Sequence, residues 1–448
     1  SERLGNWIRI RSGEAAVIVG ARSAIFAPSA NLGLIVLDEE HEGSYKQENV
    51  PRYHAKMAAQ FLAEWHNCPL VLGSATPSAE SFYEAEQERI TLLSLPVRAA
   101  TAQLPEVILK DLTEGFRHGK PALLTPELHE RMADVLAKGQ QVILFLNRRA
   151  YAPFLVCRDC GHQIRCQECS VSLSYHRRDL RLKCHQCGHQ ERAPDVCPKC
   201  AGLRLSPLGI GTERVEEAIS SHFPDAVVAR LDRDMAAKKG AVEDVLARFR
   251  SGDIHVLVGT QMVAKGLDFP NVTLVGVIAA DVSLNLPDFR ASERTFQLLS
   301  QVAGRAGRGQ IAGHVVVQTF NPEHPSVVSA QAHDFIRFYE ALREERREAG
   351  YPPFSKLINI TFVGAERRDV VTASDRSAVL LGPLRGSLKA SILGPADCAL
   401  ERLQGLWRRH LLVKLPPGTS AKPVEEALTT LGLNGVQMTL DVDPYSMM

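Results

Sequence analysis

Short apolar runs, each ended by small or polar residues, recur along the chain and predict a mostly parallel α/β fold. In the first hundred residues, 15–19, 34–37 and 70–72 fit short buried strands. Alternating strands and helices, which are typical of doubly wound sheets, follow. The later strands are expected at about 141–146, 226–231, 254–259, 273–279 and 313–319, with helices at about 126–138 and 241–250.

The residue composition and the order of predicted elements change at two places along the chain, and these changes predict the domain boundaries. Residues 99–125 carry Pro, Gly and scattered charge, and are expected to link a first lobe at 1–98 to a second lobe at 126–330. A highly charged helix at about 335–349 opens a small α+β domain at 331–448. Its remaining elements are predicted as strands near 356–363, 410–415 and 436–442 and helices near 369–388 and 422–432.

Length and charge narrow the class of protein. With 448 residues, the chain is long enough for roughly two to four domains. A formal net charge of +1 argues against a basic coat over the whole surface, so any nucleic-acid site must be local. No apolar run reaches the roughly eighteen residues that a membrane-spanning helix needs, so we expect no membrane contact.

The strand at 34–37 runs into Asp38-Glu39-Glu40-His41, and this acidic end is the first candidate site. Burying an unpaired carboxylate costs several kcal/mol, so three consecutive carboxylates would destabilise a core. At the carboxyl end of a parallel strand they can face a cation instead. Asp38 would then hold Mg²⁺ on a nucleotide, and Glu39 would orient the attacking water. The alternative is a strand that leaves the core into a solvated acidic turn.

Two loops next to predicted strands carry candidate contacts. After the acidic strand, residues 43–56 interleave aromatic and basic side chains, which suits stacking on bases and contact with phosphates. A plain surface loop fits this composition nearly as well. Residues 73–77, Gly-Ser-Ala-Thr-Pro, suit close approach to a phosphate or to a neighbouring lobe, but they could also simply cap a helix.

Eight of the ten cysteines form four Cys-x-x-Cys pairs, in an insertion at about 153–206. Each pair directs both sulfurs to one side of a tight turn, and two such knuckles complete a tetrahedral zinc site. Disulfides or a redox pair are the weaker interpretation, because paired thiols without a secretory signal are typical of metal sites in a reducing cytoplasm.

The pairing of the knuckles follows from the return of the insertion to its parent sheet. We expect the outer pairs to meet and the inner pairs to close a hairpin, although neighbouring knuckles could pair instead. Zinc 1 would be bound by Cys157, Cys160, Cys197 and Cys200, and zinc 2 by Cys166, Cys169, Cys184 and Cys187.

The second lobe carries a pattern typical of a phosphate-handling motor. Gln301 begins Gln-Val-Ala-Gly-Arg-Ala-Gly-Arg, which places Arg305 and Arg308 three residues apart on one helix face. Guanidinium groups can stabilise the charge of a transferring phosphoryl group from across a cleft. The alternative is a glycine-loosened helix with two solvated arginines. Upstream, a buried strand runs into Gly-Thr-Gln-Met and Lys-Gly-Leu-Asp at 259–268.

Taken in chain order, these motifs resemble a superfamily-2 helicase core: Asp-Glu-Glu-His, Gly-Ser-Ala-Thr-Pro, Leu-Asn-Arg-Arg at 146–149 and the two second-lobe motifs. Three further features point to one family within this superfamily. They are the cysteine insertion directly after Arg149, the Gly-Pro-Ala at 394–396 and the closing Leu-Asp-Val-Asp-Pro at 440–444. The chain resembles the family of bacterial primosomal protein N′, PriA, over its whole length. This implies two RecA-like helicase lobes, the first incomplete, with a double-zinc insertion in the second and a small α+β C-terminal domain.

The resemblance also implies a role for each matching residue. Nucleotide contacts fall on Asp38, Glu39, Gly266, Asp268, Arg305 and Arg308, with Gln301 as a further catalytic residue. DNA contacts fall on Arg22, Tyr45, Lys46, Arg52, Tyr53, Arg148, Thr260, Gln261 and Lys265. Residues that couple DNA binding to hydrolysis are His41, Ser74 and Thr76.

The activity implied by the family is ATP-dependent 3′-to-5′ DNA unwinding that restarts replication at stalled or abandoned forks. The expected cofactors are ATP with Mg²⁺ and two Zn²⁺. The expected partners are forked and single-stranded DNA, the single-strand-binding protein, primosome proteins and the replicative helicase loader, in the cytoplasm at the nucleoid. The basic and aromatic residues near 402–410 (Arg402, Trp407, Arg408, Arg409 and His410) suit contact with DNA or with the single-strand-binding protein, or are merely a solvated face.

Two features depart from the family pattern. Pro51 stands where the family often has Trp, and the printed sequence holds no Gly-x-x-x-x-Gly-Lys-Ser/Thr phosphate loop. We therefore expect the chain to be N-terminally truncated and, by itself, to bind DNA weakly and hydrolyse essentially no ATP. Two other interpretations remain: a double-strand DNA translocase or RNA helicase of the same superfamily, and a zinc-stabilised binding scaffold without ATP turnover.

Overall fold

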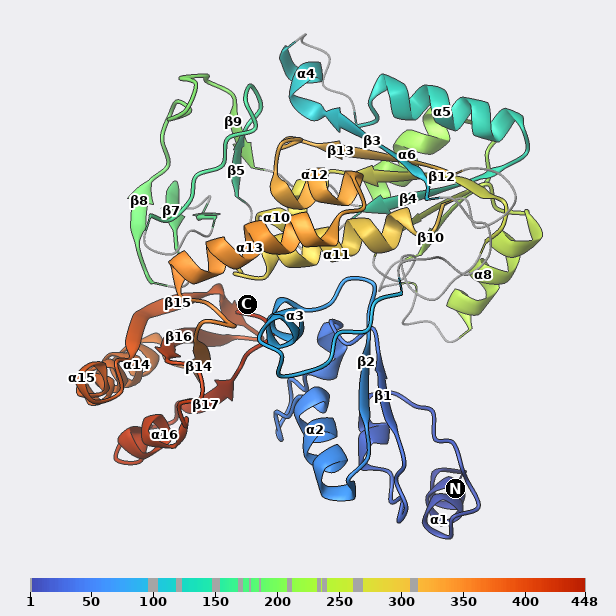
Figure 1. Ribbon diagram of the computed structural model, residues 1–448. Helices are drawn as coiled ribbons and strands as arrows, with labels where there is room; N and C mark the ends of the chain where they lie inside the picture. Colours follow the sequence, from blue (N-terminus) through green and yellow to red (C-terminus); the bar gives the residue numbers. More distant parts are fainter. Residues whose placement is uncertain are drawn as a thin grey trace. The chain divides into compact units, whose positions relative to one another are not determined.

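The computed structural model describes residues 2–95, 104–117, 123–146, 154–167, 172–176, 179–184, 187–207, 212–231, 235, 240–260, 269–306 and 313–447 (Figure 1). They form two units. Unit 1 consists of Ser1–Leu92 with Asp441–Tyr445, and unit 2 of Leu93–Leu440 with Ser446–Met448. None of the helices described is long and apolar enough to cross a membrane.

Unit 1 is built on two parallel strands, β1 (Ile35–Asp38) and β2 (Leu70–Gly73), which pair from Ile35 opposite Leu70 to Asp38 opposite Gly73. Helix α2 (Ala55–His66) packs on one face of this pair through small side chains. It ends at Asn67, whose left-handed backbone turns the chain into β2. The remaining elements are α1 (Glu2–Arg11), the 3₁₀ turns η1 (Arg22–Phe26) and η2 (Gly43–Tyr45), and α3 (Ala79–Glu86).

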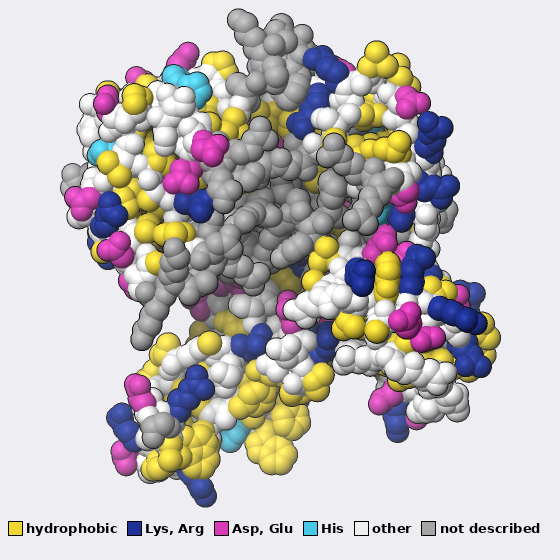
Figure 2. Space-filling model, turned by 180° about the vertical axis from the view of Figure 1, so that it is seen from behind, with side chains coloured by type: hydrophobic (Ala, Val, Ile, Leu, Met, Phe, Trp, Pro, Cys, Tyr) yellow, Lys and Arg dark blue, Asp and Glu magenta, His cyan; other side chains and the backbone are white. Residues whose placement is uncertain are grey.

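Two predictions for unit 1 are wrong. Residues 15–19 form no strand, and Val17 and Val19 are exposed, because no neighbouring strand pairs with them among the described residues. The strand at 35–38 is buried on one face only, since Ile35 and Leu37 face α2 whereas Val36 is 56% exposed. Apolar side chains are also exposed along α2, where Met57, Phe61 and Trp65 recur every fourth residue. Figure 2 shows hydrophobic side chains gathered over the part of the surface that unit 1 forms.

Unit 2 contains a six-stranded parallel sheet of order β10-β11-β4-β12-β13-β3. Five of its strands are those that the apolar runs predict: β4 (Gln141–Leu146), β10 (Val228–Leu231), β11 (Val256–Gly259), β12 (Val272–Ile278) and β13 (His314–Thr319). The sixth, β3 (Glu106–Asp111), lies in the segment predicted as a linker and is followed by α4 (Leu112–Arg117). As an edge strand it has a mixed composition rather than an apolar run.

Both faces of this sheet are covered, as its continuous apolar strands require. Helices α5 (Pro126–Ala137) and α6 (Thr212–His222) cover one face, and alternate residues of β4 point into their core with Leu128 and Ile219. On the other side of the sheet lie α10 (Asp281–Leu284), α11 (Ala291–Ala303) and α12 (Pro325–Gln331) (Figure 1). Helix α8 (Ala241–Ser251) packs beside β10 at the edge.

The cysteine insertion leaves and rejoins the lobe through an antiparallel pair, β5 (Leu155–Cys157) with β9 (Leu205–Pro207). Between them, β6 (Ser174–His176), β7 (Arg181–Lys183) and β8 (Gln190–Arg192) form a small antiparallel sheet. Its apolar core consists of Leu155, Leu173 and Leu182 with the thiols of Cys166 and Cys184.

The C-terminal region is an α+β sheet of order β15-β16-β14-β17, reached through α13 (Phe335–Ala349). Its strands are β14 (Lys356–Gly364), β15 (Ser391–Leu403), β16 (Leu406–Leu415) and β17 (Gln437–Val442), and its helices are α14 (Arg367–Leu381), α15 (Leu384–Ser387) and α16 (Lys422–Leu428). The single helix predicted at 369–388 is therefore two helices, because Pro383 interrupts it. The prediction missed β15, whose Gly-Pro pair obscures its strand pattern.

A buried ion pair ties α11 to α13. Arg346 is 1% exposed, and its guanidinium donates to the carboxylate of Glu293 at 2.6 Å and to the carbonyl of Pro352 at 3.1 Å. Arg290 lies 3.2 Å from the same Glu293 carboxylate. Removing one member of such a pair leaves a buried charge uncompensated, which typically costs about 3–5 kcal/mol.

We expect Glu293→Ala to lower the free energy of local opening of α13 by about 3–5 kcal/mol, measured by hydrogen exchange of its backbone amides. Adding Arg346→Met should restore much of the protection, because the unpaired charge is then removed. Unchanged exchange in Glu293→Ala would mean that the pair contributes nothing to the packing of α13.

Candidate nucleotide, DNA and zinc sites

The acidic strand end of unit 1 presents two carboxylates at its surface. Asp38 is the last residue of β1, and Glu39 follows it with a left-handed backbone (φ +49°). Both side chains are exposed, and the Glu39 N–H donates to Asp38 Oδ1 at 3.0 Å, which fixes that carboxylate at the carboxyl end of the strand. The two oxygen-rich groups suit a hard cation such as Mg²⁺.

The third carboxylate has a different role, which corrects the expectation that all three face a cation. Glu40 is buried and turns toward the N-terminus of α3. Its oxygens accept hydrogen bonds from the Ser78 N–H at 2.6 Å and from the hydroxyls of Ser78 and Ser81 at 3.1 and 2.7 Å. An acidic group beside the unpaired N–H groups of a helix start is stabilising. Glu40 is therefore a helix-anchoring residue.

The three predicted coupling residues lie together. His41 is buried, and its Nδ1 lies 2.7 Å from Ser74 Oγ and 3.6 Å from Glu39 Oε2. Ser74 Oγ in turn accepts from the Thr76 N–H at 3.0 Å. A continuous polar chain thus runs from the exposed Glu39, at the end of β1, to the loop that follows β2.

Hydrogen bonds to other residues of unit 1 hold the loop at 43–54, which carries predicted DNA contacts. The Arg22 guanidinium donates to the carbonyls of Ser44 and Lys46, both at 2.7 Å, and the Tyr45 hydroxyl donates to the Asp38 carbonyl at 2.7 Å. Burial and the nearby carboxylates raise the pKa of Tyr45, which keeps this donor protonated. Tyr53 packs edge-on against Phe26.

Lys46 and Arg52, the two cations of this loop, face one carboxylate. Lys46 Nζ lies 2.9 Å from Asp441 Oδ1, and an Arg52 nitrogen lies 3.5 Å from Oδ2. Arg22, Tyr45 and Lys46 therefore hold the loop in this conformation, and a direct DNA contact by them stays a prediction. The sequence offered no sign that Asp441, almost four hundred residues away, belongs to this site.

In unit 2, parts of two predicted motifs are described. Thr260 directly follows β11, and its N–H lies 3.4 Å from the Leu231 carbonyl at the end of β10. Gln301 lies in the last turn of α11, and Arg305 follows the helix with its N–H bonded to the Val302 carbonyl. Arg148, Gln261, Lys265, Gly266, Asp268 and Arg308 lie outside the described residues.

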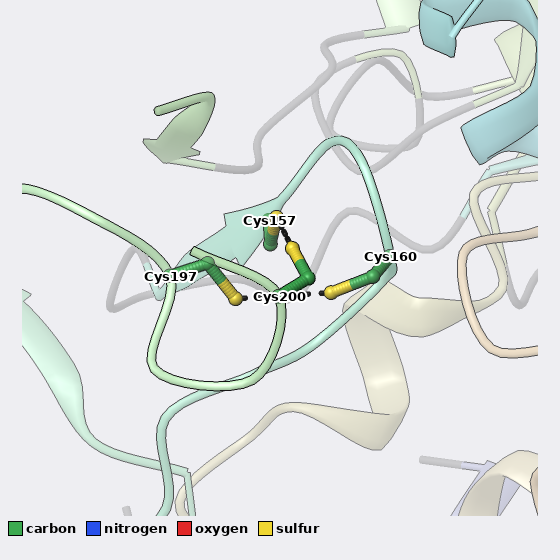
Figure 3. A group of neighbouring side chains, drawn as sticks. All are labelled: Cys157, Cys160, Cys197 and Cys200. Carbon is green, nitrogen blue, oxygen red and sulfur yellow. Dashed lines mark hydrogen bonds between the residues drawn. The ribbon is translucent and has the colours of Figure 1, made fainter. Parts of the chain in front are cut away.

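The outer cysteine pairs meet, as the nested pairing predicts (Figure 3). The sulfur atoms of Cys157, Cys160, Cys197 and Cys200 all lie within 4.8 Å of one another, with Cys157 to Cys200 at 3.6 Å and Cys160 to Cys197 at 3.7 Å. In the inner group Cys166, Cys184 and Cys187 lie together, and Cys169 is outside the described residues. Sulfurs about 2.3 Å from one tetrahedral Zn²⁺ lie about 3.8 Å apart, so the spacing fits zinc and not a disulfide.

Each described knuckle has the same backbone turn. The first cysteine's carbonyl accepts from the residue after the second cysteine, and that residue has a left-handed backbone: Gly161, Gly188 and Ala201. Glycine is required at 161, because a Cβ there would overlap the Phe320 carbonyl. Burial raises the pKa of the Cys157 thiol to about 12, so a cation is needed to hold it as a thiolate at neutral pH.

Three family models match parts of the chain: the primosomal protein N C-terminal domain at 347–445, the helicase conserved C-terminal domain at 211–310, and the PriA DNA helicase Cys-rich region at 166–192. The replication restart protein PriA of Bacillus subtilis is 44% identical over 452 residues, covering 100% of this chain and 56% of that protein. That of Synechocystis is 40% identical and covers 99% and 54%. That of Treponema pallidum is 41% identical over 454 residues, covering 100% of this chain and 67% of the relative.

The chain belongs to the PriA family. It spans about half the length of the Bacillus and Synechocystis relatives. The family assignment agrees with the α/β fold, the helicase-type second lobe, the cysteine-rich insertion and the separate C-terminal domain described above.

The C-terminal basic patch is smaller than predicted. His410 is 1% exposed and faces Asn359, and Arg409 is engaged by Asp375 at 3.1 Å and by Asp397 at 3.3 Å. The guanidinium groups of Arg367 and Arg402 lie 5.5 and 5.3 Å from the centre of the Trp407 ring. The surface patch therefore centres on Trp407 and its two flanking arginines.

We expect Arg402→Ala to weaken binding of single-stranded DNA or of the single-strand-binding protein by about two- to fivefold, because it removes an exposed cation from beside the half-buried Trp407 ring. Arg409→Ala should instead destabilise the domain and change binding little. Fluorescence anisotropy beside thermal unfolding would separate the two effects. Equal binding by Arg402→Ala and the unchanged protein would show that the patch is a solvated surface with no role in binding.

Proposed function

We propose that the full-length protein is an ATP-dependent 3′-to-5′ DNA helicase that recognises stalled or abandoned replication forks and initiates primosome assembly. The observation that carries this proposal is identity of 40–44% to curated replication restart proteins along essentially the whole chain. The helicase C-terminal domain model, which matches residues 211–310, supports a motor activity.

The proposed nucleotide chemistry begins at the end of β1. Asp38 would hold Mg²⁺, which when bound would neutralise charge on the nucleotide phosphates, and Glu39 would orient the attacking water. Both carboxylates are exposed at the strand end, which supports these roles. From the second lobe, Gln301, Arg305 and Arg308 would stabilise the transferring phosphoryl group, while Gly266 and Asp268 would contact the nucleotide.

The proposed coupling between DNA and nucleotide follows the polar chain from Glu39 through His41 to Ser74 and Thr76. A shift of the loop after β2 on DNA would change the hydrogen bond between His41 and Ser74, and so the position of Glu39. The 2.7 Å contact between His41 Nδ1 and Ser74 Oγ supports this route. DNA contacts in the second lobe would come from Arg148, Thr260, Gln261 and Lys265.

Two Zn²⁺ ions are proposed for the cysteine insertion, one in each cluster, with Cys169 as the fourth ligand of the inner cluster. The proposed partners are forked and single-stranded DNA, the single-strand-binding protein, primosome proteins and the replicative helicase loader. The proposed location is the cytoplasm at the nucleoid.

The test is strand displacement by the full-length protein on duplexes with a 3′ tail, a 5′ tail or matched RNA strands. We expect ATP-dependent unwinding of the 3′-tailed DNA and of forks, and little unwinding of the other two. Preference for the 5′ tail would reverse the proposed direction. Unwinding of the RNA duplex at an equal rate would favour the RNA helicase interpretation.

A further inference from the structure

The loop at 43–54 of unit 1 carries two cations directly beyond the acidic strand end. Lys46 Nζ is only slightly accessible, since the side chain is 6% exposed, whereas Arg52 is partly exposed. The loop is short and tightly bonded: the Gln47 N–H donates to the Tyr53 carbonyl at 2.9 Å, and Lys46 bridges to His54. A rearrangement here would reach Asp38, because Tyr45 bonds to its carbonyl.

The segment Asp441–Tyr445, defined here as the terminal segment, lies on this loop as part of unit 1. The Asp441 carboxylate is 15% exposed and lies between Lys46 and Arg52, at 2.9 and 3.5 Å. Lys46 also donates to the Val442 carbonyl at 2.7 Å. One carboxylate thus neutralises both cations of the loop, which the sequence analysis predicts as DNA contacts.

The terminal segment makes a second contact, next to the coupling residues. The Tyr445 hydroxyl donates to the His41 carbonyl at 3.1 Å. Its ring lies on Gly43 so closely that a Cβ there would overlap it. The segment therefore covers the loop at both ends: Asp441 at its cations, and Tyr445 where it leaves the Asp-Glu-Glu-His motif.

We propose that the Asp441 side chain, near the end of β17, is a displaceable cap whose carboxylate occupies the place of a DNA phosphate between Lys46 and Arg52. A carboxylate and a phosphate offer the same anionic oxygens to an ammonium and a guanidinium. Single-stranded DNA presents a phosphate at each nucleotide, so it can replace one carboxylate and gain the counterion release of phosphate binding. The cap restrains the loop when DNA is absent, and DNA frees it.

The inference rests on the proposed function, because it assumes that the protein binds DNA. Asp441→Asn in the full-length protein keeps the shape of the side chain but removes the competing charge. We expect its affinity for single-stranded oligonucleotides to rise by about two- to fivefold, the range that loss of one partly exposed ion pair gives. ATP hydrolysis without DNA should rise in the same variant, since one of the contacts that restrain the loop is removed.

A double-mutant cycle identifies the released cation. Lys46→Ala should weaken DNA binding more in the Asp441→Asn background than in the unchanged protein, because only there has the ammonium lost its carboxylate partner. Tyr445→Phe removes the hydrogen bond to His41 without changing charge, and should raise affinity in the same direction as Asp441→Asn. It also keeps the inference testable if Asp441→Asn folds poorly.

Two controls are available. Asp441→Glu retains the charge and should bind like the unchanged protein, and Glu425→Gln makes the same charge change on the exposed surface of α16. If the unchanged protein binds DNA but Asp441→Asn binds equally or more weakly, the cap is refuted and the proposed function stands. If no variant binds single-stranded DNA, the proposed function fails and the cap fails with it.

Discussion

Replacing Arg308 with alanine in the full-length protein should abolish most ATP turnover and leave DNA affinity nearly intact. A guanidinium that reaches the transferring phosphoryl group from across a cleft can contribute about 10³–10⁵ in rate. Arg305 follows the end of α11 and precedes Arg308 by three residues in the sequence, so Arg305→Ala should also lower turnover. We rank Arg308 as the finger, because Arg305 could instead contact Glu39 or the interface between the lobes.

The measurement is DNA-stimulated phosphate release, with single-stranded DNA binding measured on the same preparations. Arg248→Ala, an exposed arginine on α8, is the matched control and should hydrolyse ATP at the unchanged rate. Near-normal hydrolysis by both Arg305→Ala and Arg308→Ala would remove the finger role. Loss of DNA binding together with hydrolysis would indicate a damaged lobe and not a missing finger.

Loss of one thiolate from either cysteine cluster should release one of two zinc ions and unfold that part of the insertion. Metal binding at structural zinc sites is worth about 10–16 kcal/mol in small domains, and this energy is folding energy. The outer cluster joins β5 to the chain that leads into β9, so Cys160→Ser should expose the insertion where it leaves the lobe. Cys187→Ser should expose the small sheet of β6, β7 and β8.

Metal analysis of the purified full-length protein should return two zinc ions per chain, and one in each serine variant. Hydrogen exchange would show which half of the insertion has lost protection. Cys68→Ser is the control, because Cys68 belongs to neither cluster. One zinc or none in the unchanged protein would contradict the two-site assignment.

Much of the fold follows from local sequence pattern. Buried parallel strands need apolar residues on both faces, so β4, β11, β12 and β13 are evident as continuous apolar runs. The knuckle pairing also follows from local spacing and chain return, and the structure brings the outer four sulfurs together as expected. These elements depend on their own residues more than on distant partners.

The features that sequence pattern missed depend on contacts with distant parts of the chain. The edge strand β3 is set by its partner β13, and β15 by its partner β16. Glu40 has a carboxylate that could bind a metal ion, yet this carboxylate accepts hydrogen bonds from Ser78 and Ser81 at the start of α3. Lys46 is a predicted DNA contact, and the sequence does not show that Asp441 forms an ion pair with it. A periodic pattern indicates only the environment of a residue's own helix or strand. In these four cases, contacts with distant segments of the chain determine the structure.

The most direct test of the proposed motor function is phosphate release by the full-length protein with and without forked DNA. A motor predicts ATP hydrolysis that rises strongly when forked DNA is added and that falls when Asp38→Asn weakens the magnesium site. A zinc-stabilised scaffold predicts tight binding to the same fork with two zinc ions present and no DNA-stimulated hydrolysis. We expect the first result, and the second would contradict the motor function.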